Sequence, residues 1–178
     1  MRLFLHQAVL PICFGLLFAV CCEGDDRGSA EYQKQVAKLS RETNPIARVK
    51  VLIKMSHLDI NEVDHLVKKG DFREADRFLK RYAEDIKQAA QTLKDSKRNA
   101  QKNPAGFKDF EIALRKQLRR LEDLKLNYSF DQQEAINQAL TVAESAKEQM
   151  FQAIFGAENA GGRKDQADRK GKGKQESD

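Results

Sequence analysis

Cysteine is missing from most of this chain. All three cysteines, Cys13, Cys21 and Cys22, lie within the first 22 of 178 residues, so the remainder has no disulfide available to it. Tryptophan is absent altogether, proline occurs only three times, and 33% of the residues are charged. This composition is typical of long amphipathic helices and disfavours a compact enzyme with a deep aromatic pocket.

Catalytic motifs are also scarce. After the first 22 residues the sequence contains no glycine-rich phosphate loop and no serine nucleophile elbow, and only His57 and His65 could act as bases near neutral pH. The net charge of +5 is spread along the chain, so no segment is basic enough to predict a nucleic-acid-binding surface. We therefore expect a protein that is not an enzyme and has no cofactor, no small-molecule substrate and no nucleic-acid partner.

The N-terminal segment has the composition of an export signal. An arginine near the start is followed by an apolar core over residues 8–20, and the small residues before Cys21 and Cys22 give way to an acidic, polar stretch. The apolar core is shorter than the ~20 residues that cross a bilayer, and Pro11 interrupts it. The pattern favours a cleaved signal over a retained anchor and predicts export to the periplasm, the cell envelope or the extracellular space.

A lipid-anchored form is the alternative at the same place. In a bacterial protein, Cys21 or Cys22 could carry the acyl chain of a lipoprotein, and the residues before Cys21 show a weak resemblance to a lipobox. The stretch Phe18-Ala19-Val20 lacks the usual leucine and the usual small residue of that motif. Ordinary cleavage without lipid is therefore the preferred prediction.

Two apolar seams meet at the turn Lys68-Lys69-Gly70-Asp71. Each seam advances by alternating steps of three and four residues, which places it on one stripe of an α-helix and suits knobs-into-holes packing. Gly70 can end the first helix in the left-handed conformation, and Asp71 can cap the second. The sequence therefore predicts an antiparallel helical hairpin. The seams consist of Ile46, Val49, Ile53, Ser56, Ile60, Val63 and Val67 before the turn and Phe72, Ala75, Leu79, Tyr82, Ile86, Ala89 and Leu93 after it, with Ser56 as the one polar interruption.

Asn-Pro pairs and glycines predict the other helix boundaries. Asn44-Pro45 predicts a helix over residues 45–69, and Asn103-Pro104 predicts a restart after a helix that extends from Asp71 towards Lys102. The last helix is expected to end at Gly156. We therefore expect an all-α fold, an antiparallel bundle of about four helices with an N-terminal helical arm and a disordered C-terminal tail. The predicted parts are an export signal (1–22), a linker and short arm with a helix over 31–42 (23–44), the bundle (45–156) and the tail (157–178).

Two local motifs resemble more specialised structures. Residues 69–82 resemble the turn and second helix of a tetratricopeptide repeat, but no copy recurs about 34 residues away. Glu62 and His65 have the Glu-x-x-His spacing of di-iron bundles, with His57 and Asp64 nearby. That spacing occurs once and flanks the seam, so we expect a solvated helix edge and no metal site.

Four cations on the next helix form the candidate interaction surface. Arg115, Lys116, Arg119 and Arg120 are expected on the face opposite the leucines, where they could attract an acidic partner, phosphate or lipid headgroups. Because heptad seams specify helix packing, we expect an exported, non-catalytic interaction or envelope structural module that binds a protein partner or itself. The alternative is an amphipathic helical protein that binds lipid or a membrane surface.

Overall fold

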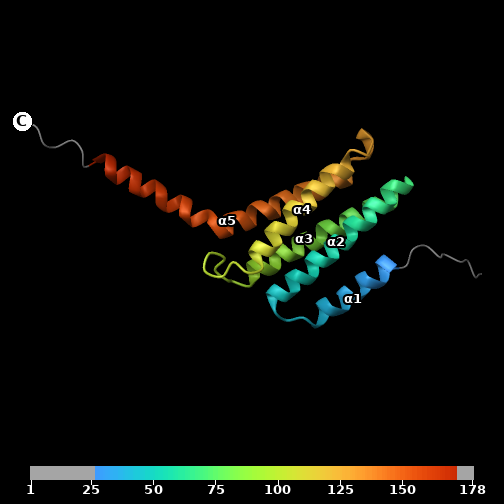
Figure 1. The fold of residues 1–178 in the computed structure, drawn as a ribbon, viewed down its shortest axis with the longest axis horizontal. Coiled ribbons are helices and arrows are strands. Elements are labelled where there is room, and N and C mark those ends of the chain that lie inside the picture. Colours follow the sequence, from blue (N-terminus) through green and yellow to red (C-terminus); the bar gives the residue numbers. More distant parts are fainter. Residues whose placement is uncertain (1–26, 172–178) are drawn as a thin grey trace, which may run out of the picture.

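The described part of the chain folds into helices. The computed structural model describes the backbone of residues 27–171 and the side chains of residues 30–156. Helices make up 83% of this part and no strand occurs in it, so the predicted all-α class is confirmed. The predicted export signal, with Cys21 and Cys22, lies outside the described residues. The helices are α1 (Arg27–Arg41), α2 (Pro45–Lys69), α3 (Phe72–Asp95), α4 (Phe107–Lys125) and α5 (Glu134–Gly171), with a short 3-10 helix η1 (Phe130–Gln132) before α5 (Figure 1).

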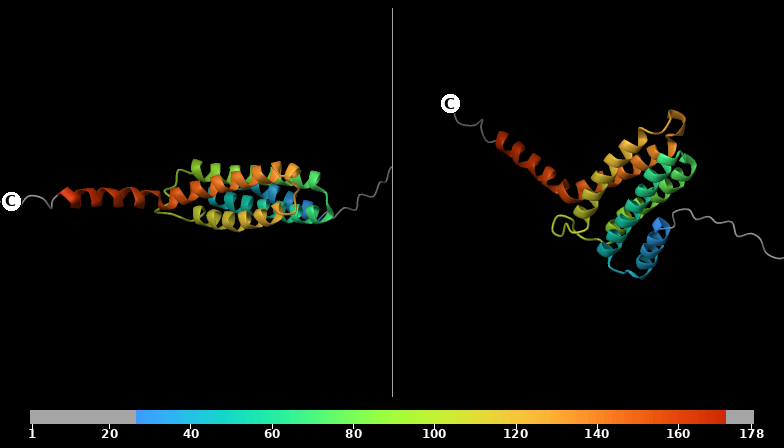
Figure 2. Two further views of the ribbon diagram at one scale, coloured as in Figure 1. Left: turned by 90° about the horizontal axis from the view of Figure 1, so that it is seen from above. Right: turned by 45° about the vertical axis from the view of Figure 1, so that its right-hand side comes forward.

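Helices α2 to α5 pack side by side, and α1 lies against the outer side of α2 (Figures 1 and 2). Around the core the order is α2, α3, α5, α4, because α2 and α5 each contact both α3 and α4. Consecutive helices α2 and α3 are antiparallel, but α2 and α4 are parallel neighbours: Lys50 pairs with Asp109, and farther along Ser56 contacts Gln117. This follows from the connection over residues 96–106, which is long enough to join α3 to the diagonally opposite helix.

Both predicted seams lie in the core. Every member is buried except Ile46, Ile53 and Phe72, which are partly buried. The Ser56 hydroxyl, the polar interruption, accepts a hydrogen bond from Gln117 Nε2 at 2.8 Å and donates to the Ile53 carbonyl at 2.9 Å. Buried polar groups are normally hydrogen-bonded, and Ser56 is satisfied in this way by a polar contact between α2 and α4.

The predicted turn chemistry is present. Gly70 has φ 78° and ends α2 in the left-handed conformation, and Asp71 accepts a hydrogen bond from the Glu74 amide at 3.1 Å. At the other end of α2, the Asn44 side chain accepts from two backbone amides of the first turn, with Pro45 as the first helical residue. The bounds of α2 are therefore those that the sequence predicts.

The boundaries predicted around Asn103-Pro104 are wrong. Helix α3 ends at Asp95 and does not reach Lys102, because its apolar seam stops at Leu93 and only Ala100 and Gly106 are buried among residues 96–106. Helix α4 begins at Phe107, which is the first residue of its buried face.

The predicted end of the last helix at Gly156 is also wrong. Helix α5 continues to Gly171, and its C-terminal part projects away from the other helices (Figures 1 and 2). A glycine inside a helix costs about 1 kcal/mol relative to alanine, which weakens a helix but does not have to end it. The structure therefore differs from the disordered tail predicted for residues 157–178, of which residues 172–178 lie outside the described part.

Candidate interaction surfaces

A groove of about 430 Å³ lies between α2 and α4. Its apolar lining comes from Ile53, the partly buried member of the α2 seam, and from Ile112 and Ala113, which lie beside the buried stripe of α4. These side chains are only partly covered by the two helices, whose contacts include the hydrogen bond between Ser56 and Gln117. The groove is therefore an apolar surface with room for side chains from another molecule. The remaining lining residues are His57, Asp109, Lys116, Gln117 and Arg120.

The four predicted cations do not share one surface. Lys116 and Arg120 line the groove, whereas Arg115 and Arg119 do not, because successive residues of a helix are rotated by about 100°. Arg115 pairs with Glu111 of its own helix at 2.8 Å. Within the described residues, Lys116 and Arg119 are exposed and form no ion pair. Only half of the predicted cluster is therefore placed to help bind a ligand in the groove.

Arg120 is already neutralised by α2. It donates hydrogen bonds to Asn61 and, at 3.4 Å, to Asp64. Asp64 also accepts from Lys68 at 2.9 Å, and the pKa of Asp64 is lowered by this hydrogen bond and by Arg120. Lys116 is consequently the uncompensated cation of the groove.

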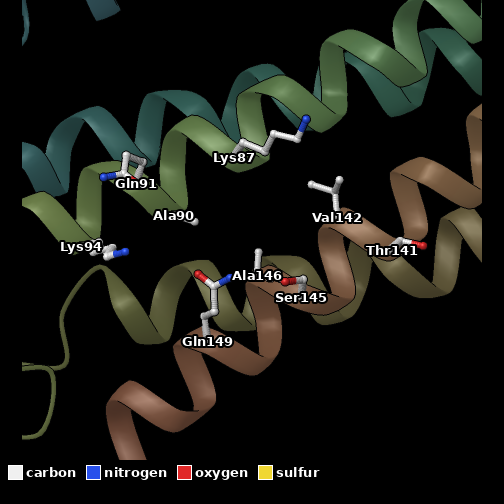
Figure 3. Close-up of a pocket in the computed structure, with 9 residues that line it drawn as sticks. All are labelled: Lys87, Ala90, Gln91, Lys94, Thr141, Val142, Ser145, Ala146 and Gln149. Atoms are coloured by element: carbon white, nitrogen blue, oxygen red, sulfur yellow. Dashed lines mark hydrogen bonds between the residues drawn. The ribbon is translucent and has the colours of Figure 1, made fainter.

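A second groove of about 450 Å³ separates α3 from α5 (Figure 3). Its inner lining consists of small or medium side chains, Ala90, Val142 and Ala146, and its rim carries Lys87 and Lys94 of α3. Lys87 lies 3.9 Å from Glu84, a contact between exposed side chains that contributes little. Because two alanines and one valine offer less apolar area than two isoleucines, we rank this groove below the one between α2 and α4.

Large apolar side chains are also exposed at two other places. At the turn between α4 and α5, Leu126 is 85% and Phe130 is 93% exposed. On α5, Phe151 and Phe155 are each 43% exposed, and their ring centroids are 4.9 Å apart. Exposed apolar residues that gather in one place are more informative than single ones, so both places are candidate contact sites.

A buried charge cluster joins α1, α2 and α3. Arg81 Nε donates to Asp59 Oδ1 at 2.9 Å, and its Nη2 donates to the same oxygen. The guanidinium carbon lies 3.6 Å from the centroid of the Tyr32 ring and 4.6 Å from that of Phe78, so two aromatic rings cover the cation. The Tyr32 hydroxyl donates to Asp85 Oδ2 at 3.4 Å. Two buried carboxylates, Asp59 and Asp85, thus share a single guanidinium.

Because two carboxylates share one guanidinium, the pKa values of the groups in this cluster are shifted. Asp59 is fully buried, and its Oδ2 has no hydrogen-bond partner among the described residues. Burial raises the pKa of Asp59 to about 6 in spite of the hydrogen bond from Arg81. Burial and the neighbouring Asp59 raise the pKa of Asp85 to about 7, and burial together with Asp85 raises the pKa of Tyr32. The carboxyl groups therefore change charge near neutral pH.

Sequence reasoning missed this cluster because it followed only the stripe of α2 that forms the heptad seam. A second stripe, Val51, Met55 and Asp59, advances in steps of four and is also buried. The signal in the sequence was Asp59, a carboxylate that continues the four-residue spacing of two apolar residues and therefore lies on the same buried stripe.

The two histidines of α2 lie on the helix that carries the Glu-x-x-His spacing. Between residues 30 and 156, no three or more histidine, cysteine, aspartate or glutamate side chains are grouped to hold a metal ion, and His57 is exposed at the edge of the groove. No helix in the described region combines the length and apolar character needed to cross a membrane. Comparisons of the chain with protein-family models, curated proteins and solved structures found no match.

Proposed function

We propose that this protein is an exported, non-catalytic helical module that binds a protein partner in the groove between α2 and α4. In this proposal α2 to α5 act as a four-helix scaffold and α1 as an arm. The observation that carries it is the pairing of half-exposed isoleucines, Ile53 and Ile112, with the uncompensated cation Lys116. An amphipathic partner helix with carboxylates beside its apolar side chains fits this chemistry.

The buried carboxyl groups whose pKa values are raised support a role other than catalysis. Asp59 and Asp85 are buried between helices and line neither groove, so no substrate held in a groove would meet them. A general acid or base must lie within hydrogen-bond reach of its substrate. Export is inferred from the N-terminal sequence alone.

Two charge reversals on α4 test the groove. Lys116→Glu places a negative charge at the groove, and Arg119→Glu makes the same change on the same helix outside it. The protein and both variants would be used as bait in quantitative affinity purification from the native host, followed by titration of the recovered partner against each purified variant. We expect Lys116→Glu to weaken binding at least tenfold and Arg119→Glu to change it less than threefold, since the latter alters only the general charge.

If Lys116→Glu and Arg119→Glu weakened partner binding equally, the groove would not be the binding site, and only non-specific electrostatic attraction would remain. Circular dichroism of both variants is the control for folding. A partner that binds Lys116→Glu as tightly as the native protein would show that another surface is used.

Binding to a membrane surface is the second candidate function. It is favoured by the exposure of Leu126 and Phe130 at the end of the bundle where Lys68 and Lys69 also lie, since contact between the Phe72 and Tyr128 rings brings the two turns together. Exposed aromatic residues beside lysines are typical of interfacial anchors. Flotation with vesicles containing anionic lipid tests this: binding that is lost in Phe130→Ser and retained in Phe151→Ser would favour the membrane over a protein partner.

A further inference from the structure

Helix α1 is held by few contacts. Among its side chains from Ala30 onwards, only Tyr32 and Gln35 are buried, and Leu39 is half-buried. Gln35 donates its hydrogen bond to Glu31 within the same helix at 2.8 Å, so its buried side chain contributes packing but no hydrogen bond to a neighbouring helix. Tyr32 is therefore the main anchor of α1 on the other helices.

This anchor rests on the buried charge cluster. The Tyr32 ring covers the Arg81 guanidinium, and the Tyr32 hydroxyl reaches Asp85. Docked α1 thus separates two carboxylates from water on this side while only one cation is present to balance them. Removal of α1 would rehydrate the carboxylates, which stabilises their charged forms.

The connection between α1 and α2 provides a pivot. Arg48 Nη1 donates hydrogen bonds to the carbonyl groups of Leu39 and Glu42 at 2.9 and 2.8 Å, so it holds the C-terminal end of α1 on α2. Towards the other end, the additional link is an exposed ion pair between Lys54 and Glu31 at 2.5 Å, and exposed pairs contribute little. The N-terminal part of α1 can therefore move away while its C-terminal end stays attached.

We propose that α1 is a detachable strap that closes over α2 and α3 at acidic pH and is released as the pH rises, with Tyr32 as its latch on Arg81 and Asp85. In the docked state burial raises the pKa of Asp59 to about 6 and that of Asp85 to about 7, although the hydrogen bond from Tyr32 lowers the pKa of Asp85. Release of α1 admits water to these two carboxylates, which share one guanidinium under the Tyr32 ring, so the docked state binds protons more strongly than the released state. Docking is then tightest below the ordinary carboxyl pKa of about 4 and weakens as the pH rises through 6 to 7. Above that range both carboxylates are charged beside one guanidinium.

The other charged groups around Asp85 do not supply a second cation. Glu62 and Glu84 add negative charge and raise the pKa values of Asp59 and Asp85 respectively. Lys54 is engaged by Glu31. The titratable and charged groups that face the cluster are Glu31 and Tyr32 from α1, Lys54, Asp59 and Glu62 from α2, and Arg81, Glu84 and Asp85 from α3.

Hydrogen exchange of the full chain tests the strap. Protection factors, corrected for the intrinsic pH dependence of exchange, would be measured between pH 5.5 and 8 for amides of α1 and, as an internal reference, of α3. We expect α1 protection to fall at least tenfold over this range and to stay well below α3 protection at every pH, because α1 opens without unfolding of α3 and one titrating group alone contributes up to about tenfold per pH unit. An α1 protection that is constant, or that equals that of α3 at every pH, would overturn the strap.

Three variants separate the latch from other causes. Asp85→Asn removes one titrating charge and should reduce the fall in α1 protection to less than threefold. Glu144→Gln removes an exposed carboxylate of α5 and should behave as the native protein. Tyr32→Ala should leave α1 unprotected at every pH while α3 stays protected, and this variant remains informative if Asp85→Asn fails to fold. Full α1 protection in Tyr32→Ala, or a native pH response in a folded Asp85→Asn, would refute the latch.

Release of α1 can be distinguished from binding in the α2–α4 groove. The latch residues Tyr32, Arg81 and Asp85 do not line that groove, so either mechanism can fail in its own experiment without affecting the other.

Discussion

Replacement of Gly106 by alanine tests how closely the start of α4 packs against the rest of the core. Gly106 has φ 86° and ψ −49°, a conformation that costs an L-residue about 1–3 kcal/mol. A Cβ atom there would lie 2.5 Å from Ile46 Cδ1 and 3.4 Å from Leu93 Cδ2, and relief of such overpacking costs a further ~1–3 kcal/mol. The smaller entropy of the unfolded alanine chain offsets about 0.4–1 kcal/mol. We expect Gly106→Ala to lower the free energy of unfolding by about 2–4 kcal/mol.

Gly70→Ala is the matched control for backbone strain. Gly70 also has positive φ, 78°, but a Cβ atom there would meet nothing within 4 Å, so the expected loss is only about 1 kcal/mol. Ile46→Val removes the Cδ1 atom that the new methyl group would approach. Combined with Gly106→Ala, it should therefore recover about 1 kcal/mol relative to the sum of the single changes.

The assay is urea unfolding followed by circular dichroism, with the midpoint compared at unchanged slope. Equal losses for Gly106→Ala and Gly70→Ala, or additivity of Gly106→Ala with Ile46→Val, would refute close packing at this site.

Three further predictions follow from burial, charge and the N-terminal sequence. The free energy of unfolding should fall by roughly 2–4 kcal/mol as the pH rises from about 4 to 8, because the folded chain holds protons on Asp59 and Asp85 that the unfolded chain has released. Urea unfolding at several pH values measures this, and Asp85→Asn should give a flatter profile. Leu79→Asp should abolish cooperative folding, since Leu79 is fully buried and an unpaired charge there costs several kcal/mol against a total stability of ~5–15 kcal/mol; an unchanged thermal melt would contradict this. The mature protein should begin just after Cys21-Cys22 or at one of these cysteines with a lipid attached. Mass spectrometry of the purified N-terminus distinguishes the two forms. An intact Met1 on a cytosolic protein would contradict export.

Much of the helical structure could be predicted because its causes lie within a few residues of each other. Gly70, Asp71 and Asn44 satisfy backbone groups of adjacent turns, so their effects can be read from neighbouring residues. The heptad seams place their members on one stripe by helix geometry alone. Prediction failed at Pro104 and Gly156, where a local signal for a boundary competed with the position of buried residues or with the helix propensity of the following segment.

The sequence alone therefore determined the all-α class, the bounds of α2 and the heptad seams of α2 and α3. Tertiary structure decided which helices are neighbours, because the diagonal connection over residues 96–106 is compatible with more than one arrangement. That arrangement places Lys116 in a groove beside Ile53, leaves Arg119 outside it, and brings Tyr32, Asp59 and Asp85 from three helices to one guanidinium. Side chains far apart in the sequence interact only after the helices have packed, so the groove and the α1 strap both depend on contacts that no single segment specifies.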